Sequence, residues 1–252
     1  MKVSIITPTY NCSNYVASTI HSVLAQTLQD FEIIIVDDCS IDNTVEVIQR
    51  IKDERIKLFV NEKNMGPAYS RNKALMYASG EYVAFLDGDD LWFPDKLEKQ
   101  ISFMEKNKYF FSYTNYEEID ENGNKLNSFL TGPKRINHRE FMRACYVGCL
   151  TVMYKRELIP DLQIPADIYK RNDYALWLKV SERSDCYLLD EILASYRRGA
   201  GISSGRKTRL LKYHKDLFMK LYNYGLYRAW LLSLRNAIFY LLKRIKYHRK
   251  KC

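Results

Sequence analysis

Short apolar runs that alternate with helical patterns constrain the fold of this chain more than any other feature. The apolar runs occupy residues 2–7, 31–36, 56–60 and 82–86. Between them, apolar residues recur at the spacing of one helix face, as they do over residues 16–24. Strands that alternate with helices predict a parallel sheet with right-handed crossovers, so we expect an α/β protein.

The fourth apolar run leads directly into three carboxylates, Asp87, Asp89 and Asp90. In an open α/β sheet, ligands bind beyond the carboxyl ends of the strands, where these side chains would emerge. Close like charges need a cation, a proton or full solvation, and Gly88 lets the backbone turn between the first two. Hard oxygen ligands are typical of Mg²⁺ or Mn²⁺, which shares its shell with substrate phosphates. The alternative is a solvated acidic turn. An EF-hand is excluded because its third ligand would be Leu91.

Polar residues also follow the first two apolar runs: Pro8, Thr9 and Tyr10 after the first, Asp37 and Asp38 after the second. All of them would lie at the same sheet edge as the acidic turn. A carboxylate there can accept a hydrogen bond from a base or a ribose, and Tyr10 can stack on a base. The edge has neither the G-x-G-x-x-G nor the P-loop pattern, which argues against dinucleotide binding and ATP hydrolysis.

Arg71 is the basic residue that we expect nearest to this edge. It lies in a helix that Pro67 is suited to begin. Its planar guanidinium could bind a diphosphate. The alternative is a solvated arginine on the helix surface.

The net charge of +9 is unevenly distributed along the 252 residues. Residues 206–252 contain 14 Lys and Arg and one acidic residue, Asp216, so the basic excess belongs to this C-terminal segment. The six cysteines are scattered without a C-x-x-C pair, and this pattern argues against a zinc site. No signal-peptide pattern follows Met1, so we expect a cytoplasmic protein with reduced thiols.

The C-terminal segment is expected to be helical from Lys207 nearly to its end. Its apolar run over residues 229–242 is interrupted by Arg235 and is too short to span a bilayer. Aromatic residues beside a polybasic stretch favour contact with an anionic membrane surface. The alternative is a helix packed on the body with a solvated charged end. No nucleic-acid-binding module is recognisable, so we expect no nucleic-acid partner.

Several stretches together resemble the family 2 glycosyltransferases of the GT-A fold. They are residues 6–11 (ITPTYN), 35–44 (IVDDCSIDNT), 64–72 (NMGPAYSRN) and 85–90 (FLDGDD). Their order and spacing match over residues 2–100, and the resemblance returns at residues 171–174 (RNDY) and at Tyr196 and Arg197. The resemblance implies a Rossmann-like, mostly parallel central sheet flanked by helices, with a helical C-terminal extension.

The same resemblance implies a metal-dependent, inverting hexosyltransferase. The donor would be a nucleotide-diphosphate sugar such as a UDP-hexose. The acceptor would be a hydroxyl of a lipid-linked or polysaccharide substrate in bacterial capsule, O-antigen or lipooligosaccharide biosynthesis. Such an enzyme would be cytoplasmic and peripheral on the inner face of the cytoplasmic membrane.

Residue roles follow from the matched motifs. Asp173 would be the catalytic base, and Asp87 and Asp89 would hold Mn²⁺ or Mg²⁺. The nucleotide-sugar-binding residues would be Pro8, Thr9, Tyr10, Asp38, Arg71, Asp87, Gly88 and Arg197. The chain departs from the family pattern at Asn172, where Glu is common, and at Arg198, in a region where a His is often found.

The resemblance also implies a division of the chain. Residues 1–205 would form the catalytic domain, with a nucleotide-sugar-binding half (1–100) and an acceptor-binding half (101–205). Residues 206–252 would form the basic extension.

Two other functions stay open from the sequence. One is a catalytically inactive nucleotide-sugar-binding or scaffold protein of the same pathway, against which the intact acidic residues argue. The other is a nucleotidyltransferase, which would need a glycine-rich N-terminal loop with a basic residue, and residues 8–11 (PTYN) are not such a loop.

Overall fold

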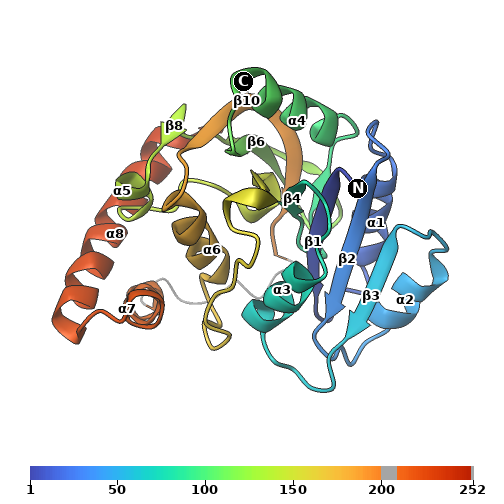
Figure 1. The fold of residues 1–252 in the computed structure, drawn as a ribbon, viewed down its shortest axis with the longest axis horizontal. Helices are drawn as coiled ribbons and strands as arrows, with labels where there is room; N and C mark the ends of the chain where they lie inside the picture. Colours follow the sequence, from blue (N-terminus) through green and yellow to red (C-terminus); the bar gives the residue numbers. More distant parts are fainter. Residues whose placement is uncertain (200–208, 251–252) are drawn as a thin grey trace.

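Strands and helices alternate over the first hundred residues as the sequence predicts (Figure 1). The computed structural model describes residues 1–199 and 209–250. The strands are β1 (Val3–Thr9), β2 (Phe31–Asp37), β3 (Ile56–Val60), β4 (Tyr82–Phe85), β5 (Leu91–Trp92), β6 (Phe111–Ile119), β7 (Lys125–Leu130), β8 (Arg135–Ile136), β9 (Met153–Lys155), β10 (Cys186–Arg197) and β11 (His248–Lys250). The helices are α1 (Val16–Leu24), α2 (Thr44–Arg50), α3 (Pro67–Met76), α4 (Lys96–Asn107), α5 (His138–Phe141), α6 (Asn172–Ser181), α7 (Arg209–Tyr222) and α8 (Leu226–Tyr247), with short 3-10 helices η1 (Cys149–Thr151) and η2 (Arg156–Leu158).

One sheet runs through the molecule in the order β11-β7-β6-β9-β4-β1-β2-β3. From β4 to β3 the neighbouring strands are parallel. The chain moves outward from β1 to β3 and returns to β4 on the other side of β1. In open α/β sheets, ligands bind beyond the carboxyl ends of the strands at such a reversal of strand order.

The half of the sheet beyond β4 is mixed. β9 is antiparallel to both β4 and β6, and β10 is parallel to β6. β6 and β7 form a hairpin around the polar turn at residues 120–124. The short β5, directly after the acidic turn, pairs with β10 and brings the end of β10 to that turn.

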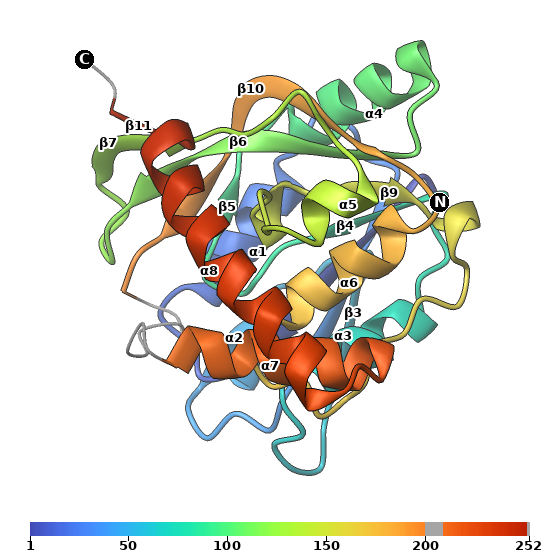
Figure 2. The same cartoon turned by 90° about the vertical axis from the view of Figure 1, so that its left-hand side faces the viewer.

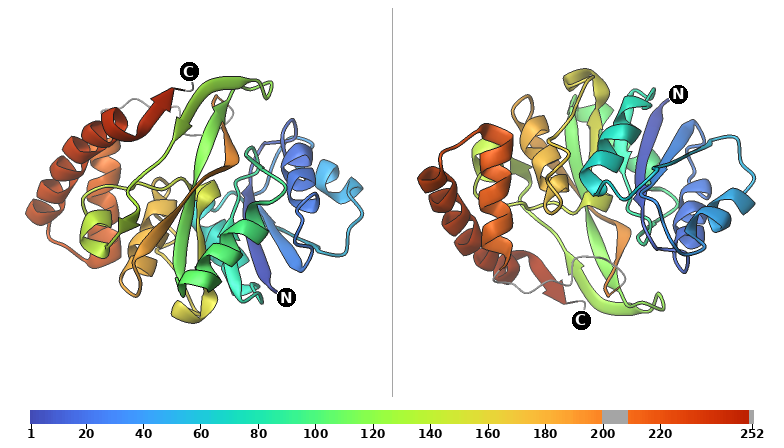
Figure 3. Two further views of the ribbon diagram at one scale, coloured as in Figure 1. Left: turned by 90° about the horizontal axis from the view of Figure 1, so that it is seen from above. Right: turned by 90° about the horizontal axis from the view of Figure 1, so that it is seen from below.

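Apolar side chains cover both faces of the parallel strands because successive residues point to opposite sides. Ile5 of β1 packs in the cluster that contains Val16 of α1. Ile6 packs in the cluster that contains Ala68 of α3 and Trp177 of α6. Figures 1 and 3 show α1 and α2 on one side of these strands and α3 and α6 on the other.

The C-terminal segment packs on the body through two helices (Figure 2). Ala229, Ser233 and Asn236 of α8 are buried, and Asn236 Nδ2 donates to the Tyr174 hydroxyl at 3.0 Å. After α8, β11 pairs with β7. The strand β11 was not predicted, because its sequence is charged. The expected helical extension is confirmed, whereas the proposed boundary at 205/206 lies outside the described residues. Among the helices of the described residues, none is both long and apolar enough to cross a membrane.

Candidate active site

The acidic turn after β4 holds its three carboxylates in different environments. Asp90 is almost fully buried, and its Oδ1 accepts the backbone N–H of Arg197 at 3.0 Å. Its carbonyl oxygen accepts the hydroxyl of Thr19 at 2.9 Å. Asp87 and Asp89 remain partly exposed. Asp90 therefore anchors the turn, while the other two carboxylates are accessible from solvent.

The electrostatics of the turn favour a bound cation. Burial and the charge of Asp87 raise the pKa of Asp89 to about 6. Burial and the charges of Asp89 and Asp87 raise the pKa of Asp90 well above its ordinary value. Crowded carboxylates of this kind become easier to ionise when a metal ion neutralises them. Oxygen ligands two positions apart suit Mg²⁺ or Mn²⁺, so Asp87 and Asp89 fit the expected ion.

The protein offers only part of a coordination shell. Within residues 1–199 and 209–250, no group of three or more His, Cys, Asp and Glu side chains is arranged to hold a metal ion. Mg²⁺ and similar ions commonly bind through one or two carboxylates and complete their shell with water and substrate phosphate. The two carboxylates are consistent with an ion that binds together with a diphosphate.

Gly88 is closely surrounded by side chains from the end of β1 and the loop after it. A Cβ atom at this position would lie 2.9 Å from Cys12 Sγ and 3.0 Å from Thr9 Cγ2. The acidic turn is therefore packed directly against the end of β1. This close approach brings Thr9 and the acidic turn into one site, as the sequence predicted.

Arg71 joins the acidic turn to α6. It is 5% exposed, forms an ion pair with Asp87 and donates to Oδ1 of Asn172. Its Nη2 also lies 3.8 Å from Cys149 Sγ. Burial alone would lower the pKa of Arg71, but the charge of Asp87, with smaller contributions from Cys149 and Asp173, raises it. The alternative of a solvated arginine on the helix surface is excluded, because this side chain is buried and links the acidic turn to α6.

Asp173 is brought to the same place by its helix. It lies in the first turn of α6, directly after Asn172, and is partly exposed. Burial raises the pKa of the Cys149 thiol well above its ordinary value, and the charges of Asp87 and Asp173 add to this effect. The contacts of Arg71 give the geometry: it donates to Asn172 and pairs with Asp87, so the start of α6, which carries Asp173, lies next to the acidic turn.

The ends of β1 and β2 are connected by their side chains. Thr9 Oγ1 donates to Asp37 at 2.9 Å. The buried carboxylate of Asp38 accepts Asn61 Nδ2 at 2.9 Å and the backbone N–H groups of Met65 and Gly66, both at 2.8 Å. Asp38 therefore fixes the loop that leads into α3, and its contact with a base stays a prediction.

Pro8 and Tyr10 flank Thr9 at the end of β1, and both are partly exposed. Their expected contacts with a nucleotide sugar also stay predictions.

Arg197 clamps the acidic turn against the β6–β7 hairpin. Its Nε donates to the carbonyl of Asp89 at 2.9 Å, and its Nη1 donates to that of Glu121 at 3.1 Å. Its guanidinium lies 4.8 Å from the centre of the Tyr15 ring. A positioning role for Arg197 was not predicted from the sequence. Its contact with a nucleotide sugar stays a prediction.

Three residues of this site were missed or left without a role. Asn172, Asn61 and Cys149 contact residues that were predicted. Only Asn172 carried a signal, because it stands in the RNDY stretch where the family pattern has Glu. The other two are recognisable only from the folded chain.

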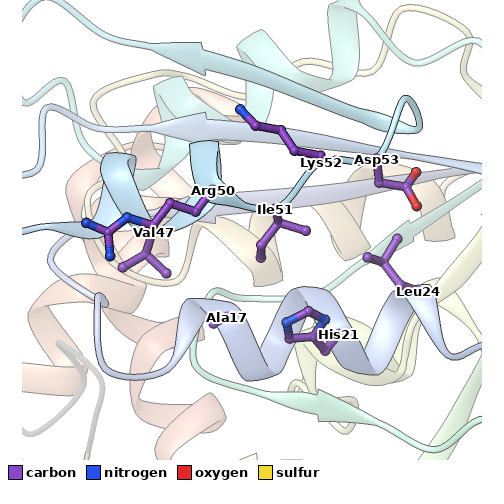
Figure 4. Close-up of a pocket in the computed structure, with 8 residues that line it drawn as sticks. All are labelled: Ala17, His21, Leu24, Val47, Arg50, Ile51, Lys52 and Asp53. Atoms are coloured by element: carbon purple, nitrogen blue, oxygen red, sulfur yellow. The ribbon is translucent and has the colours of Figure 1, made fainter.

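A separate groove lies between α1 and α2 (Figure 4). It encloses about 580 Å³ and is lined by Ala17, His21, Leu24, Val47, Arg50, Ile51, Lys52 and Asp53. Leu24 ends α1, and Arg50 ends α2, so both lead toward the amino ends of the following strands. The groove therefore lies away from the edge that carries the acidic turn.

Comparison with known proteins gives consistent matches. The model of the family Glycosyl transferase family 2 matches residues 4–162. A putative teichuronic acid biosynthesis glycosyltransferase TuaG of Bacillus subtilis is 42% identical over 83% of this chain and 84% of its own length. A UDP-Glc:alpha-D-GlcNAc-diphosphoundecaprenol beta-1,3-glucosyltransferase WfgD of Escherichia coli is 39% identical over 85% of this chain and 84% of its own length.

Solved structures confirm the predicted GT-A fold. Staphylococcus aureus TarS 1-349 in complex with UDP has a TM-score of 0.70 and 21% identity, covering 92% of this chain and 70% of that chain. The mannosyltransferase PcManGT of Pyrobaculum calidifontis, in complex with GDP-Man and Mn²⁺, has a TM-score of 0.65 and 20% identity, covering 97% of this chain and 75% of that chain.

Proposed function

Because the chain belongs to glycosyltransferase family 2, we propose that it transfers a hexose from a UDP-sugar to a hydroxyl of an undecaprenyl-diphosphate-linked saccharide. The reaction serves assembly of a bacterial surface polysaccharide. The activities named for TuaG and WfgD, which match this chain along most of their own length, support this substrate class. The observation that carries the proposal is the link from Asp87 through Arg71 to Asn172, because it joins a cation-binding turn to the helix with the general base.

The donor binds beyond the carboxyl ends of β1, β2 and β4. Asp38 contacts the base, Tyr10 stacks on it, and Pro8, Thr9, Gly88 and Arg197 shape the rest of the site. In this arrangement residues 1–100, together with Arg197, bind the donor, and the acceptor-binding half is residues 101–205.

Two features of the site would neutralise the charge of the diphosphate: an ion held by Asp87 and Asp89, and the guanidinium of Arg71. Asp87 and Asp89 would hold a Mn²⁺ or Mg²⁺ ion, and the bound ion would supply charge neutralisation to the leaving diphosphate. The guanidinium of Arg71, held beside Asp87, adds a fixed positive charge at the same place.

Asp173 acts as the base. It accepts the proton of the acceptor hydroxyl, whose oxygen attacks the anomeric carbon from the face opposite to the diphosphate, so the configuration is inverted. The buried Cys149 is not a competing nucleophile, because its pKa lies well above its ordinary value and the thiolate is the reactive form.

The test is UDP release and product formation with a panel of UDP-sugars and a lipid-diphosphate-linked N-acetylglucosamine acceptor. We expect activity with Mn²⁺ or Mg²⁺ and none in EDTA. Asp89→Asn should abolish activity. The control is Asp95→Asn, which removes an exposed acid that pairs with Lys99.

Asp173→Asn tests the base separately. It should lower turnover by ~10²–10⁴-fold, while thermal protection by the donor stays close to that of the unchanged protein. If no UDP-sugar protects the protein or is consumed, the inactive scaffold becomes the better description. If donor binding collapses while turnover at saturation persists, Asp173 binds the donor instead.

A further inference from the structure

A stripe of exposed apolar side chains runs along α8. The α8 stripe consists of Tyr227, Leu231, Leu234, Ile238, Leu242 and Ile245. Their exposed fractions range from 49% for Leu231 to 81% for Ile245. They recur every three or four residues and so share one face of the helix. A continuous apolar surface of this kind marks an interaction site.

The α8 stripe lies on the outer side of the helix. Ala229, Ser233 and Asn236, whose positions fall on the opposite face, are buried against the body. Figure 2 shows α8 along the outside of the molecule. The stripe is therefore not used in the packing of the described residues.

Basic residues border the stripe. Arg228 and Lys246 of α8 are exposed, as is Arg249 of β11 after the end of the helix. The one acidic residue of the C-terminal segment, Asp216, is paired with Lys215 at 2.8 Å. A second copy of the chain would bring equal positive charge against this face, whereas an anionic lipid surface is complementary to it.

We propose that α8 lies flat on an anionic lipid bilayer, with the α8 stripe inserted below the headgroups and Arg228 and Lys246 among them. The proposal rests on the proposed function in one respect: membrane docking would give the enzyme access to a lipid-linked acceptor. Helices of this composition lie in the interface plane, consistent with the lack of a spanning helix among the described residues.

This orientation brings the acceptor site near the membrane. Asn236, opposite the stripe, donates to Tyr174, the neighbour of Asp173. One helix diameter, about 10–12 Å, thus separates the bilayer from the helix that carries the base. Lys243, next to Leu242 of the stripe, donates to the carbonyl of Cys145 at 2.7 Å, which fixes α8 to the loop before Cys149.

The test is co-sedimentation of the full chain with vesicles of phosphatidylglycerol and phosphatidylcholine. We expect binding that high salt weakens and that pure phosphatidylcholine vesicles do not reproduce. The double variant Leu234→Asp with Ile238→Asp should reduce binding by at least about tenfold, because it places charges at positions that would be inserted into the bilayer. The control is Met76→Asp, which makes the same kind of change at an exposed apolar residue of α3.

The outcomes separate this proposal from the proposed function. If the unchanged protein and the double variant consume donor equally with a water-soluble acceptor, and only the former binds vesicles, the proposal holds. If both bind vesicles equally, or neither binds, docking through α8 is wrong, whatever the enzymatic result. If the unchanged protein is a dimer in solution that the double variant dissociates, the stripe binds a second copy instead. Vesicle binding without any donor consumption overturns the proposed function and leaves the docking surface in place.

Discussion

The side chain of Arg71, in α3, donates a hydrogen bond to Asn172, the first residue of α6, across 101 positions of sequence. The same guanidinium forms an ion pair with Asp87. One buried side chain therefore fixes the distance between the acidic turn and the helix that carries Asp173. Removal of either partner leaves a buried charge with fewer contacts, which is costly in a protein interior.

Asn172→Ala tests this link. The change leaves an Arg71 donor without its acceptor, so the free energy of unfolding should fall by about 1–3 kcal/mol. Turnover should fall more than donor affinity does, because the neighbouring Asp173 loses its fixed position. Urea unfolding and the dependence of UDP release on donor concentration measure the two effects.

The matched control is Asn107→Ala, which removes an exposed asparagine that donates to the carbonyl of Phe103 within its own helix. It should leave both quantities nearly unchanged. Equal effects of the two substitutions would show that the link between Arg71 and Asn172 has no special role.

Gly88→Ala should disturb the acidic turn. The added methyl group would collide with Cys12 Sγ and Thr9 Cγ2, and overpacking of this kind costs about 1–3 kcal/mol. We expect weaker Mn²⁺ activation together with lower stability in thermal unfolding.

A second substitution, Cys12→Ala, removes the sulfur and should restore part of both losses. Gly225→Ala is the control, because a Cβ at Gly225 meets no atom within 4 Å. If the second substitution restores nothing, contact with Cys12 is not the cause.

The arrangement of residues 1–100 could be predicted from the sequence because its signals are local. Apolar runs define the parallel strands, and the polar residues that follow them must meet at one edge. Thr9, Asp38 and Asp87 needed no tertiary information for this placement. Proline at the start of α3 likewise marked a helix boundary correctly.

Other features depend on contacts that no local pattern encodes. Arg71 was expected to face a ligand, and its pairing with Asp87 and Asn172 arises only when α3, β4 and α6 pack together. The last strand, β11, has a charged sequence, and the exposed backbone of β7 supplies its pairing.

Protonation of His214 at acid pH should destabilise the packing of the C-terminal helices. This side chain of α7 is 3% exposed, and burial, with a smaller effect of Arg171, lowers its pKa to about 3. The unfolded chain binds this proton near the ordinary value of 6.5 and the folded chain only near 3. Stability is therefore lost as pH falls through this window.

The comparison that checks this effect is His214→Phe, which keeps a ring beside Tyr174 and cannot be protonated. Its urea midpoint should depend less on pH between 6.5 and 3 than that of the unchanged protein. His21→Phe, at an exposed position of α1, serves as control. Parallel pH profiles of the unchanged protein and His214→Phe would refute the assignment.

The buried Lys96 should make the free energy of unfolding depend on pH at neutral to alkaline pH. It is fully buried, donates to Gln100 at 2.7 Å and lies 4.2 Å from the centre of the Trp92 ring. Burial lowers its pKa from 10.5 to about 7. Between these values the unfolded chain holds a proton that the folded chain has released, so stability rises with pH, by up to about 1.4 kcal/mol per pH unit.

Lys96→Met keeps the length of the side chain and removes the titrating group. The difference in free energy of unfolding between Lys96→Met and the unchanged protein should be largest near pH 7 and shrink toward pH 10.5. Near pH 7 the variant should be the more stable protein, because it no longer buries an ammonium group. Urea unfolding across this range measures the difference, with the exposed Lys63→Met as control. A constant difference would show that Lys96 keeps its ordinary pKa in the folded protein, with Gln100 and Trp92 sufficient to stabilise its charge.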